Sequence, residues 1–126
     1  KTDPDHARAN NNIGIALGSR GEFEPALGHF RRALAADPAY AEAHNNMAIT
    51  LGSMGRFDEA IGHFRKAIKI NPRYAEAQNN LGGLLGTQGK FDEAITHFRA
   101  AIKADPDFEG ARRNLKLAQE AKNNPQ

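Results

Sequence analysis

Cysteine and tryptophan are both absent from the 126 residues. Without cysteine, the chain has no disulfide framework, no thiolate ligand for a metal and no cysteine nucleophile. No apolar run approaches the roughly 20 residues that a membrane-spanning helix needs. We therefore expect a soluble segment that does not insert into a membrane. The absence of cysteine leaves its compartment undecided, with the cytoplasm favoured.

An excess of charge of one sign is also missing, because 17 basic residues stand against 15 acidic ones and the two signs are interspersed. A nucleic-acid-binding domain usually carries a basic patch on one face. The densest basic stretch, at Arg112, Arg113 and Lys116, has no aromatic residue interleaved with it, which is typical of a solvated helix face. Nucleic acid is not an expected partner.

What the chain does contain is an internal repeat of 34 residues, with units at 7–40, 41–74 and 75–108. The second and third units agree at 20 of 34 positions. Repeats of this length are typical of solenoids, in which each unit contacts only its neighbours. The sequence therefore predicts one supersecondary unit used three times.

Each unit contains two turn signals, which divide it into two helices. Glycine ends a helix readily because it adopts the left-handed conformation, so we expect helices to end at Gly21, Gly55 and Gly89. A capping side chain followed by proline suits the first turn of a helix. We expect further helices to begin at Asp37-Pro38, Asn71-Pro72 and Asp105-Pro106.

Small and large apolar residues recur at the repeat period. The small ones, which allow two helices to approach closely, are Gly14, Ala48 and Gly82 on first helices and Ala26, Ala60 and Ala94 on second helices. The large ones that we expect in the core include Ile13, Met47 and Leu81 on first helices and Phe30, Phe64 and Phe98 on second helices. Recurrence on apolar faces favours core packing over a cofactor pocket.

On these small-residue, phenylalanine and proline positions, residues 7–108 resemble tetratricopeptide repeats. The resemblance implies an all-α fold, a right-handed solenoid of three helix-turn-helix repeats whose first helices line the concave side. One departure is visible near the start of each unit. Where the family usually has tryptophan, this chain has Asn10, His44 and Gln78.

We expect residues 1–126 to form a single repeat array. Asp3-Pro4 aligns with Asp37-Pro38, which suggests that the sequence starts on the last residues of a preceding unit and is a fragment of a longer chain. After the third repeat, Ala111, Leu115 and Ala118 share one helical side among polar residues. This pattern predicts a capping helix at about 106–122, which solenoids need to cover their last apolar face.

Paired asparagines recur on the first helices, where a helix would prefer alanine or leucine. Counting 100° steps places Asn46 opposite the packed face of its helix. Its equivalents are 34 residues apart, so the solenoid would form a concave ladder of Asn12, Asn46, Asn80 and Asn114. Beside this ladder we expect Asn11, Asn45 and Asn79, the apolar residues Ile15, Ile49 and Leu117, and glycines at 18, 52 and 86 that widen the groove.

An asparagine amide can hold the C=O and N–H of an extended peptide whatever its sequence. Stacked helices lie roughly 8–10 Å apart and an extended chain advances about 3.3 Å per residue, so asparagines could meet about every third peptide residue. The ladder resembles that of the O-linked N-acetylglucosamine transferase repeats, which implies peptide-backbone binding by the four asparagines. The other interpretation is that paired asparagines serve solubility or local hydrogen bonding.

A second family precedent does not apply. Clamps for a C-terminal carboxylate, as in co-chaperones of the large heat-shock proteins, need lysine and arginine on the concave stripe. The corresponding positions here are Asn11, Ile15, Asn46, Glu76 and Asn80. An acidic C-terminal peptide is therefore not an expected ligand.

Histidines also recur, at His29, His63 and His97. Equivalent atoms of neighbouring repeats lie about 10 Å apart, far more than a Zn–N bond of about 2.0–2.1 Å, so the three cannot share one metal ion. We expect interhelical packing or surface exposure, with titration near neutral pH. No serine has a histidine placed to activate it, so we predict no catalytic residue and no enzyme activity. We also expect no metal and no cofactor.

The leading hypothesis is a protein-interaction scaffold that binds an extended segment of a protein partner in its concave groove. Two alternatives stay open. The open ends of the solenoid could build homo-oligomers, or the array could be the substrate-recruiting arm of a larger enzyme such as a glycosyltransferase.

Overall fold

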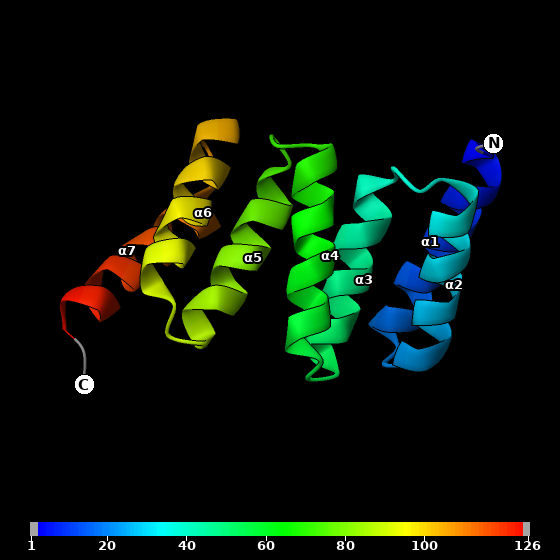
Figure 1. Cartoon of the computed structure of the whole chain (residues 1–126), viewed down its shortest axis with the longest axis horizontal. Helices are drawn as coiled ribbons and strands as arrows, with labels where there is room; N and C mark the ends of the chain where they lie inside the picture. Colours follow the sequence, from blue (N-terminus) through cyan, green and yellow to red (C-terminus); the bar gives the residue numbers. More distant parts are fainter. Residues whose placement is uncertain (1–2, 125–126) are drawn as a thin grey trace. The chain divides into compact units, whose positions relative to one another are not determined.

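The computed structural model describes residues 3–124, which form seven α-helices and no β-strand (Figure 1). They are α1 (Pro4–Ser19), α2 (Phe23–Ala36), α3 (Ala41–Ser53), α4 (Phe57–Ile70), α5 (Ala75–Thr87), α6 (Phe91–Ala104) and α7 (Glu109–Asn123). The predicted all-α class, with three helix pairs and a final single helix, is confirmed. None of these helices is both long and apolar enough to cross a membrane.

The helices fall into two compact units, which divide after Asn71. In the first unit, α1 packs on α2, α3 packs on α4, and α3 also contacts α1 and α2. In the second unit, α6 packs on both α5 and α7, and α5 also contacts α7. In both units, therefore, a first helix contacts the second helix of its own pair and the next first helix along the chain.

The first helix of each pair ends at a glycine, as the sequence predicts. Gly21, Gly55 and Gly89 have φ angles of 77°, 78° and 78°. Beyond the first of them, the N–H of Glu22 donates to the C=O of Leu17 at 2.9 Å and closes the helix end. Glycine adopts this left-handed conformation without the steric cost that other residues incur.

The later first helices start farther along the chain than the sequence predicts. They begin three residues after the turn prolines, at Ala41, Ala75 and Glu109. The carboxylate of Asp37 accepts a hydrogen bond from the N–H of Ala39 at 3.2 Å, and that of Asp105 accepts one from Asp107 at 3.1 Å. These two Asx turns keep Pro38 and Pro106 between helices, because the carboxylate bonds two residues ahead instead of capping a helix.

Glycine and phenylalanine set the closest approach of the paired helices. A Cβ atom added at Gly14 would lie 2.5 Å from Cε1 of Phe30, and one at Gly82 would lie 2.6 Å from Cε1 of Phe98. Both rings are buried. The alanines expected at the helix contacts are fully buried too: Ala26, Ala48, Ala60 and Ala94. The predicted role of the small residues is therefore confirmed.

Ile13 departs from the expected core. Its exposed fraction is 45%, whereas that of Met47, at the same repeat position, is 5%. Met47 lies on α3, which packs on the preceding pair α1 and α2. Among the described residues α1 has no preceding helix pair to cover Ile13, so the side chain stays in contact with solvent.

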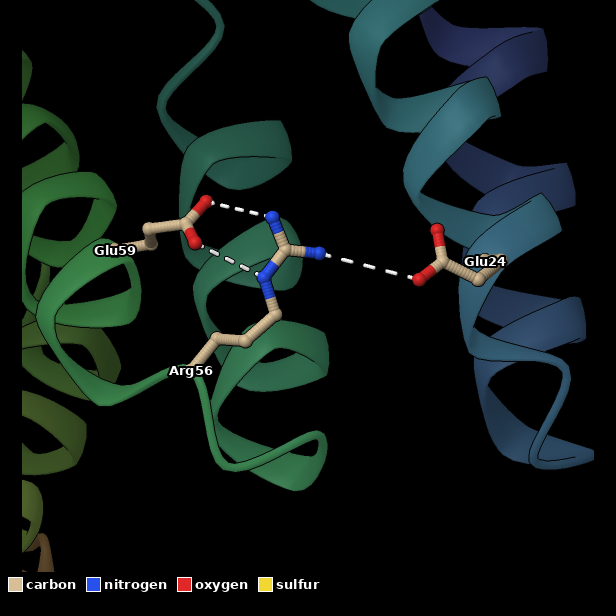
Figure 2. A network of polar contacts seen from close by, with 3 residues as sticks. All are labelled: Glu24, Arg56 and Glu59. Carbon is tan, nitrogen blue, oxygen red and sulfur yellow. Dashed lines mark hydrogen bonds and ion pairs between the residues drawn. The ribbon is translucent and has the colours of Figure 1, made fainter.

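A charged network connects the start of α4 with α2 (Figure 2). Arg56 donates from Nε to Oε1 of Glu59 at 2.9 Å and from Nη2 to Oε2 at 2.8 Å. Its Nη1 lies 4.0 Å from Oε2 of Glu24 on α2. The hydrogen bond from Arg56 lowers the pKa of Glu59. Because both carboxylates are exposed, the network contributes little to the stability of the fold.

A polar contact joins the two helices of every repeat. It connects the residue at the family's tryptophan position with the histidine 19 residues later, in the pairs Asn10–His29, His44–His63 and Gln78–His97. The distances from the histidine Nδ1 to Oδ1, Nδ1 and Oε1 of these partners are 3.0, 3.1 and 2.7 Å. The expected interhelical role of the periodic histidines is therefore confirmed.

The middle repeat differs from the other two because two imidazoles meet. Nε2 of His44 lies 3.3 Å from the C=O of Pro38 and must donate to it, so Nδ1 of neutral His44 accepts the hydrogen bond from His63. Burial lowers the pKa of His44. Burial, aided by His44 and Lys66, lowers the pKa of His63 to about 4. The expectation of titration near neutral pH is therefore wrong for His63.

We expect this histidine pair to make the fold acid-sensitive. In the unfolded chain a histidine takes up a proton below its ordinary pKa of 6.5, whereas the pKa of folded His63 is about 4. Stability should therefore fall by roughly 1–2 kcal/mol between those pH values, after discounting for solvent screening at the half-buried His63. His44→Gln, which copies the third repeat, removes the contribution of His44 but not the burial of His63, so it should reduce this loss in urea unfolding at several pH values.

The reciprocal variant is the control for this prediction. Gln78→His places a second imidazole pair in the third repeat and should make the loss of stability between those pH values steeper. The carboxylates titrate in the wild-type chain and in both variants, so their effect on the free energy of unfolding cancels in the comparison. Parallel curves of unfolding free energy against pH would rule out the histidine pair as the cause.

Two adjacent glycines provide a test of the helix contact. Gly82→Ala should lower the free energy of unfolding by roughly 1–3 kcal/mol, because its Cβ would overlap the ring of Phe98. Gly83→Ala is the matched control, since its Cβ would meet no atom within 4 Å. It should raise the free energy of unfolding by up to about 1 kcal/mol through helix propensity. Equal effects in urea unfolding would contradict the close contact.

Candidate functional site

The two asparagines of each pair occupy different environments. The first asparagine is 3% exposed at Asn11, 2% exposed at Asn45 and half-buried at Asn79. The second is exposed at Asn12 and half-buried at Asn46, Asn80 and Asn114. Asn45 and Asn80 both have polar interactions within the chain. Consecutive helix residues point 100° apart, so the members of a pair serve different purposes.

Hydrogen bonds connect asparagines on neighbouring first helices. In the first unit, Nδ2 of Asn46 on α3 donates to Oδ1 of Asn11 on α1 at 3.1 Å, and Nδ2 of Asn11 donates to Oη of Tyr40 at 3.3 Å. In the second unit, Nδ2 of Asn114 on α7 donates to Oδ1 of Asn79 on α5 at 3.1 Å. The asparagines thus join neighbouring first helices in a way that alanine or leucine could not.

A pocket of about 290 Å³ in the first unit is lined by residues of α1, α2 and α3, including Asn46. Ile15 and Ile49, which are 44% and 45% exposed, contribute aliphatic walls, and Phe30 contributes part of its ring. The remaining lining residues are Gly14, Gly18, Ser19, Phe23, Thr50 and Ser53. The structure therefore brings Asn46, Ile15 and Ile49 together around one pocket.

The second unit contains the equivalent pocket, of about 300 Å³, lined by residues of α5, α6 and α7. Asn114 and Leu117 line this pocket as Asn46 and Ile49 line the first one. Each lies two repeat lengths after its counterpart in the sequence. Leu117 is 57% exposed. The other lining residues are Gly83, Gly86, Thr87, Phe91, Phe98, Ala118 and Ala121. The same arrangement of one amide beside apolar walls thus occurs once in each unit.

Hydroxyl groups in the first pocket donate to their own helices. Thr50 Oγ1 bonds the C=O of Asn46 at 3.0 Å, Ser19 Oγ that of Ile15 at 2.9 Å, and Ser53 Oγ that of Ile49 at 3.2 Å. Their protons are therefore already engaged. What the pocket offers a partner is apolar surface, the amide of Asn46 and hydroxyl oxygens that can still accept a hydrogen bond.

Charge is absent from the walls of both pockets. The positions that would form a carboxylate clamp also lack lysine and arginine, as the sequence indicates. Within residues 3–124 no group of three or more histidine, cysteine, aspartate or glutamate side chains could hold a metal ion. The arrangement favours neutral groups over ionic ones.

Sequence reasoning misses one part of this site, the phenylalanines of the second helices. The sequence pattern assigns Phe30 and Phe98 to the core alone, whereas each ring is buried and also lines a pocket. The sequence does carry a signal for this role, namely the glycine opposite each ring, Gly14 for Phe30 and Gly82 for Phe98. Because glycine has no side chain, it leaves part of the ring uncovered. Gly52, expected to widen the groove, does not line the first pocket.

Solved structures, among them two TPR domains, share this fold. The first TPR of Spaghetti (RPAP3), bound to the HSP90 peptide SRMEEVD, has a TM-score of 0.91 at 20% identity, covering 96% of both chains. MamA has a TM-score of 0.86 at 26% identity, covering 96% of this chain and 71% of that one. The second TPR domain of human RPAP3, in complex with the HSP70 peptide SGPTIEEVD, has a TM-score of 0.84 at 24% identity, covering 93% and 98%.

Sequence comparison gives the family directly. None of the curated proteins matches the chain. A family model described as Tetratricopeptide repeat matches residues 40–107, more than half of the chain, and a second model of that description matches 1–41 and 11–51. These ranges agree with the helix pairs, the turn glycines and the glycine–phenylalanine contacts described above. The chain belongs to the tetratricopeptide repeat family.

Proposed function

We propose that this chain is a protein-interaction module whose pockets receive an extended segment of a partner protein, and that it has no enzyme activity of its own. The observation that carries the proposal is the occurrence, in each unit, of an asparagine amide beside an exposed aliphatic side chain and a pocket of about 300 Å³ or slightly less. The proposed contact residues are Asn12, Asn46, Asn80, Asn114, Ile15, Ile49 and Leu117, with Asn11, Asn45 and Asn79 as their neighbours.

Hydrogen bonds and apolar contacts would contribute differently to binding. A hydrogen bond contributes a net ~0.5–1.5 kcal/mol, so a few amides alone fall short of the roughly −8 kcal/mol of micromolar binding. Aliphatic side chains of the partner, buried in the pockets, add about 0.8 kcal/mol per CH₂ group. We therefore propose that the amides hold the partner's backbone while the pockets select apolar side chains.

The peptides bound by the similar structures differ from this expected partner. SRMEEVD and SGPTIEEVD, bound by the RPAP3 domains, both end in acidic residues. The pockets of this chain are neutral, so a carboxylate would lose its hydration and gain no cation there. We propose that the partner segment is uncharged where it enters the pockets.

Selection of short random peptides by this chain should enrich sequences with uncharged aliphatic side chains. Asn46→Ala should weaken a selected peptide that binds at the first pocket by roughly 2- to 13-fold, because one hydrogen bond to the peptide is lost. Calorimetric titration measures the difference. Unchanged affinity would remove the amides from the mechanism and leave the fold assignment intact.

Two isoleucines provide the matched control for the apolar part. Ile13 and Ile49 are each 45% exposed, but only Ile49 lines a pocket. Ile49→Ala should weaken the selected peptide roughly tenfold, through lost apolar burial, whereas Ile13→Ala should leave its affinity unchanged. Equal losses would mean that general surface hydrophobicity, and not the pocket, drives binding.

The acidic heat-shock peptides provide a second test. SRMEEVD should bind this chain no more tightly than a scrambled version with an amidated C-terminus, because the walls of the two described pockets contain no lysine or arginine. Binding of the selected aliphatic peptide should also change little between low and high salt. Preferential, salt-sensitive binding of SRMEEVD would show that lysines or arginines outside the described pockets form a clamp.

A further inference from the structure

We propose that Asn11 and Tyr40 are positioning residues for Asn46, which they orient so that its carbonyl oxygen Oδ1 faces the partner. This inference rests on the proposed function and goes further, since it names the group that the partner must supply. That group is a backbone N–H of the extended segment, opposite Asn46.

The orientation follows from two consecutive hydrogen bonds. Asn11 Nδ2 donates to Tyr40 Oη at 3.3 Å, which leaves Oδ1 of Asn11 directed at α3. Asn46 Nδ2 then donates to that Oδ1 at 3.1 Å. One end of the Asn46 amide is thereby held against α1. Among residues 3–124, Oδ1 of Asn46 has no hydrogen-bond partner.

Burial keeps this relay in one arrangement. Asn11 is only 3% exposed, so it cannot exchange its hydrogen bonds for water without cost. Rotating the Asn46 amide by 180° would bring Oδ1 of Asn46 against Oδ1 of Asn11, two acceptors with no proton between them. The half-buried Asn46 therefore presents an acceptor toward its pocket while its nitrogen stays bonded to α1.

The second unit repeats the orientation with a shorter relay. Asn114 Nδ2 donates to Asn79 Oδ1 at 3.1 Å, as Asn46 does to Asn11. Phe108 stands where the first unit has Tyr40, so no hydroxyl is present to accept from Asn79. The hydroxyl of Tyr40 is therefore the difference between the two relays. Tyr40→Phe gives the first unit the residue that the second unit has at this position.

An acceptor at Asn46 limits the chemistry of the partner. A backbone N–H can meet Oδ1, whereas proline or an N-methylated residue has no proton to donate at that position. Replacing one peptide bond by an ester removes the same proton with little change of shape. The proposal therefore predicts one ester-sensitive position in a bound peptide for the amide of Asn46.

The test uses the best peptide from random selection and a series of its variants, each with a single ester bond. At one position the ester should weaken binding to the wild-type chain by roughly 2- to 13-fold, the range of one neutral hydrogen bond. The same ester should not weaken the affinity of the Asn46→Ala variant any further. In the Tyr40→Phe variant it should weaken the affinity less than in the wild-type chain. An ester cost that is equal in wild type and Asn46→Ala would overturn the inference.

A second readout needs no peptide. In the NMR spectrum of the free chain, one of the two Nδ2 protons of Asn46 should be shifted downfield and protected from exchange, and Tyr40→Phe should reduce both effects while the fold persists. Two freely exchanging protons in the wild type would overturn the orientation. If random selection enriches no peptide at all, the proposed function fails, whereas the NMR result still decides the relay.

Discussion

The close approach of glycine to phenylalanine within a repeat is the contact on which both the fold and the site depend. Because Gly14 and Gly82 have no Cβ, the rings of Phe30 and Phe98 lie against the first helices of their pairs. The same rings line the two pockets, since no side chain on the glycine covers them. In the first and third repeats, one steric fact therefore sets the spacing of the paired helices and also leaves an apolar surface open beside Asn46 and Asn114. In the middle repeat Ala48 takes the place of the glycine.

Polar residues supply what this apolar packing cannot, namely a unique register between helices. Each repeat places one polar contact at the family's tryptophan position, and each unit connects successive first helices through an asparagine hydrogen bond. A buried amide or imidazole without its partner costs free energy, so these contacts disfavour a shifted arrangement. The first asparagine of a pair is thus structural, whereas Asn46 and Asn114 combine an interhelical hydrogen bond through Nδ2 with a place in the wall of a pocket.

The sequence alone predicts most of the fold because repetition, turn glycines and small residues act locally. It does not predict that helices start at Ala41, Ala75 and Glu109, because Asp37 could cap a helix or form an Asx turn with equal chemical ease. The candidate site, likewise, can be predicted from the sequence only in part. Angular counting groups Asn46 with Ile49, but the bonds from Asn46 to Asn11 and from His63 to His44 depend on the three-dimensional register of separate helices.

The central claim is that a partner contacts the second asparagine of each pair and the aliphatic residues beside it. The most direct measurement is NMR chemical-shift mapping of the chain with a peptide selected from a random library. The account predicts the largest shifts at the side chains of Asn46, Ile49, Asn114 and Leu117, with Ile13 unchanged. Shifts concentrated on residues outside the two pockets, with those side chains unaffected, would contradict it.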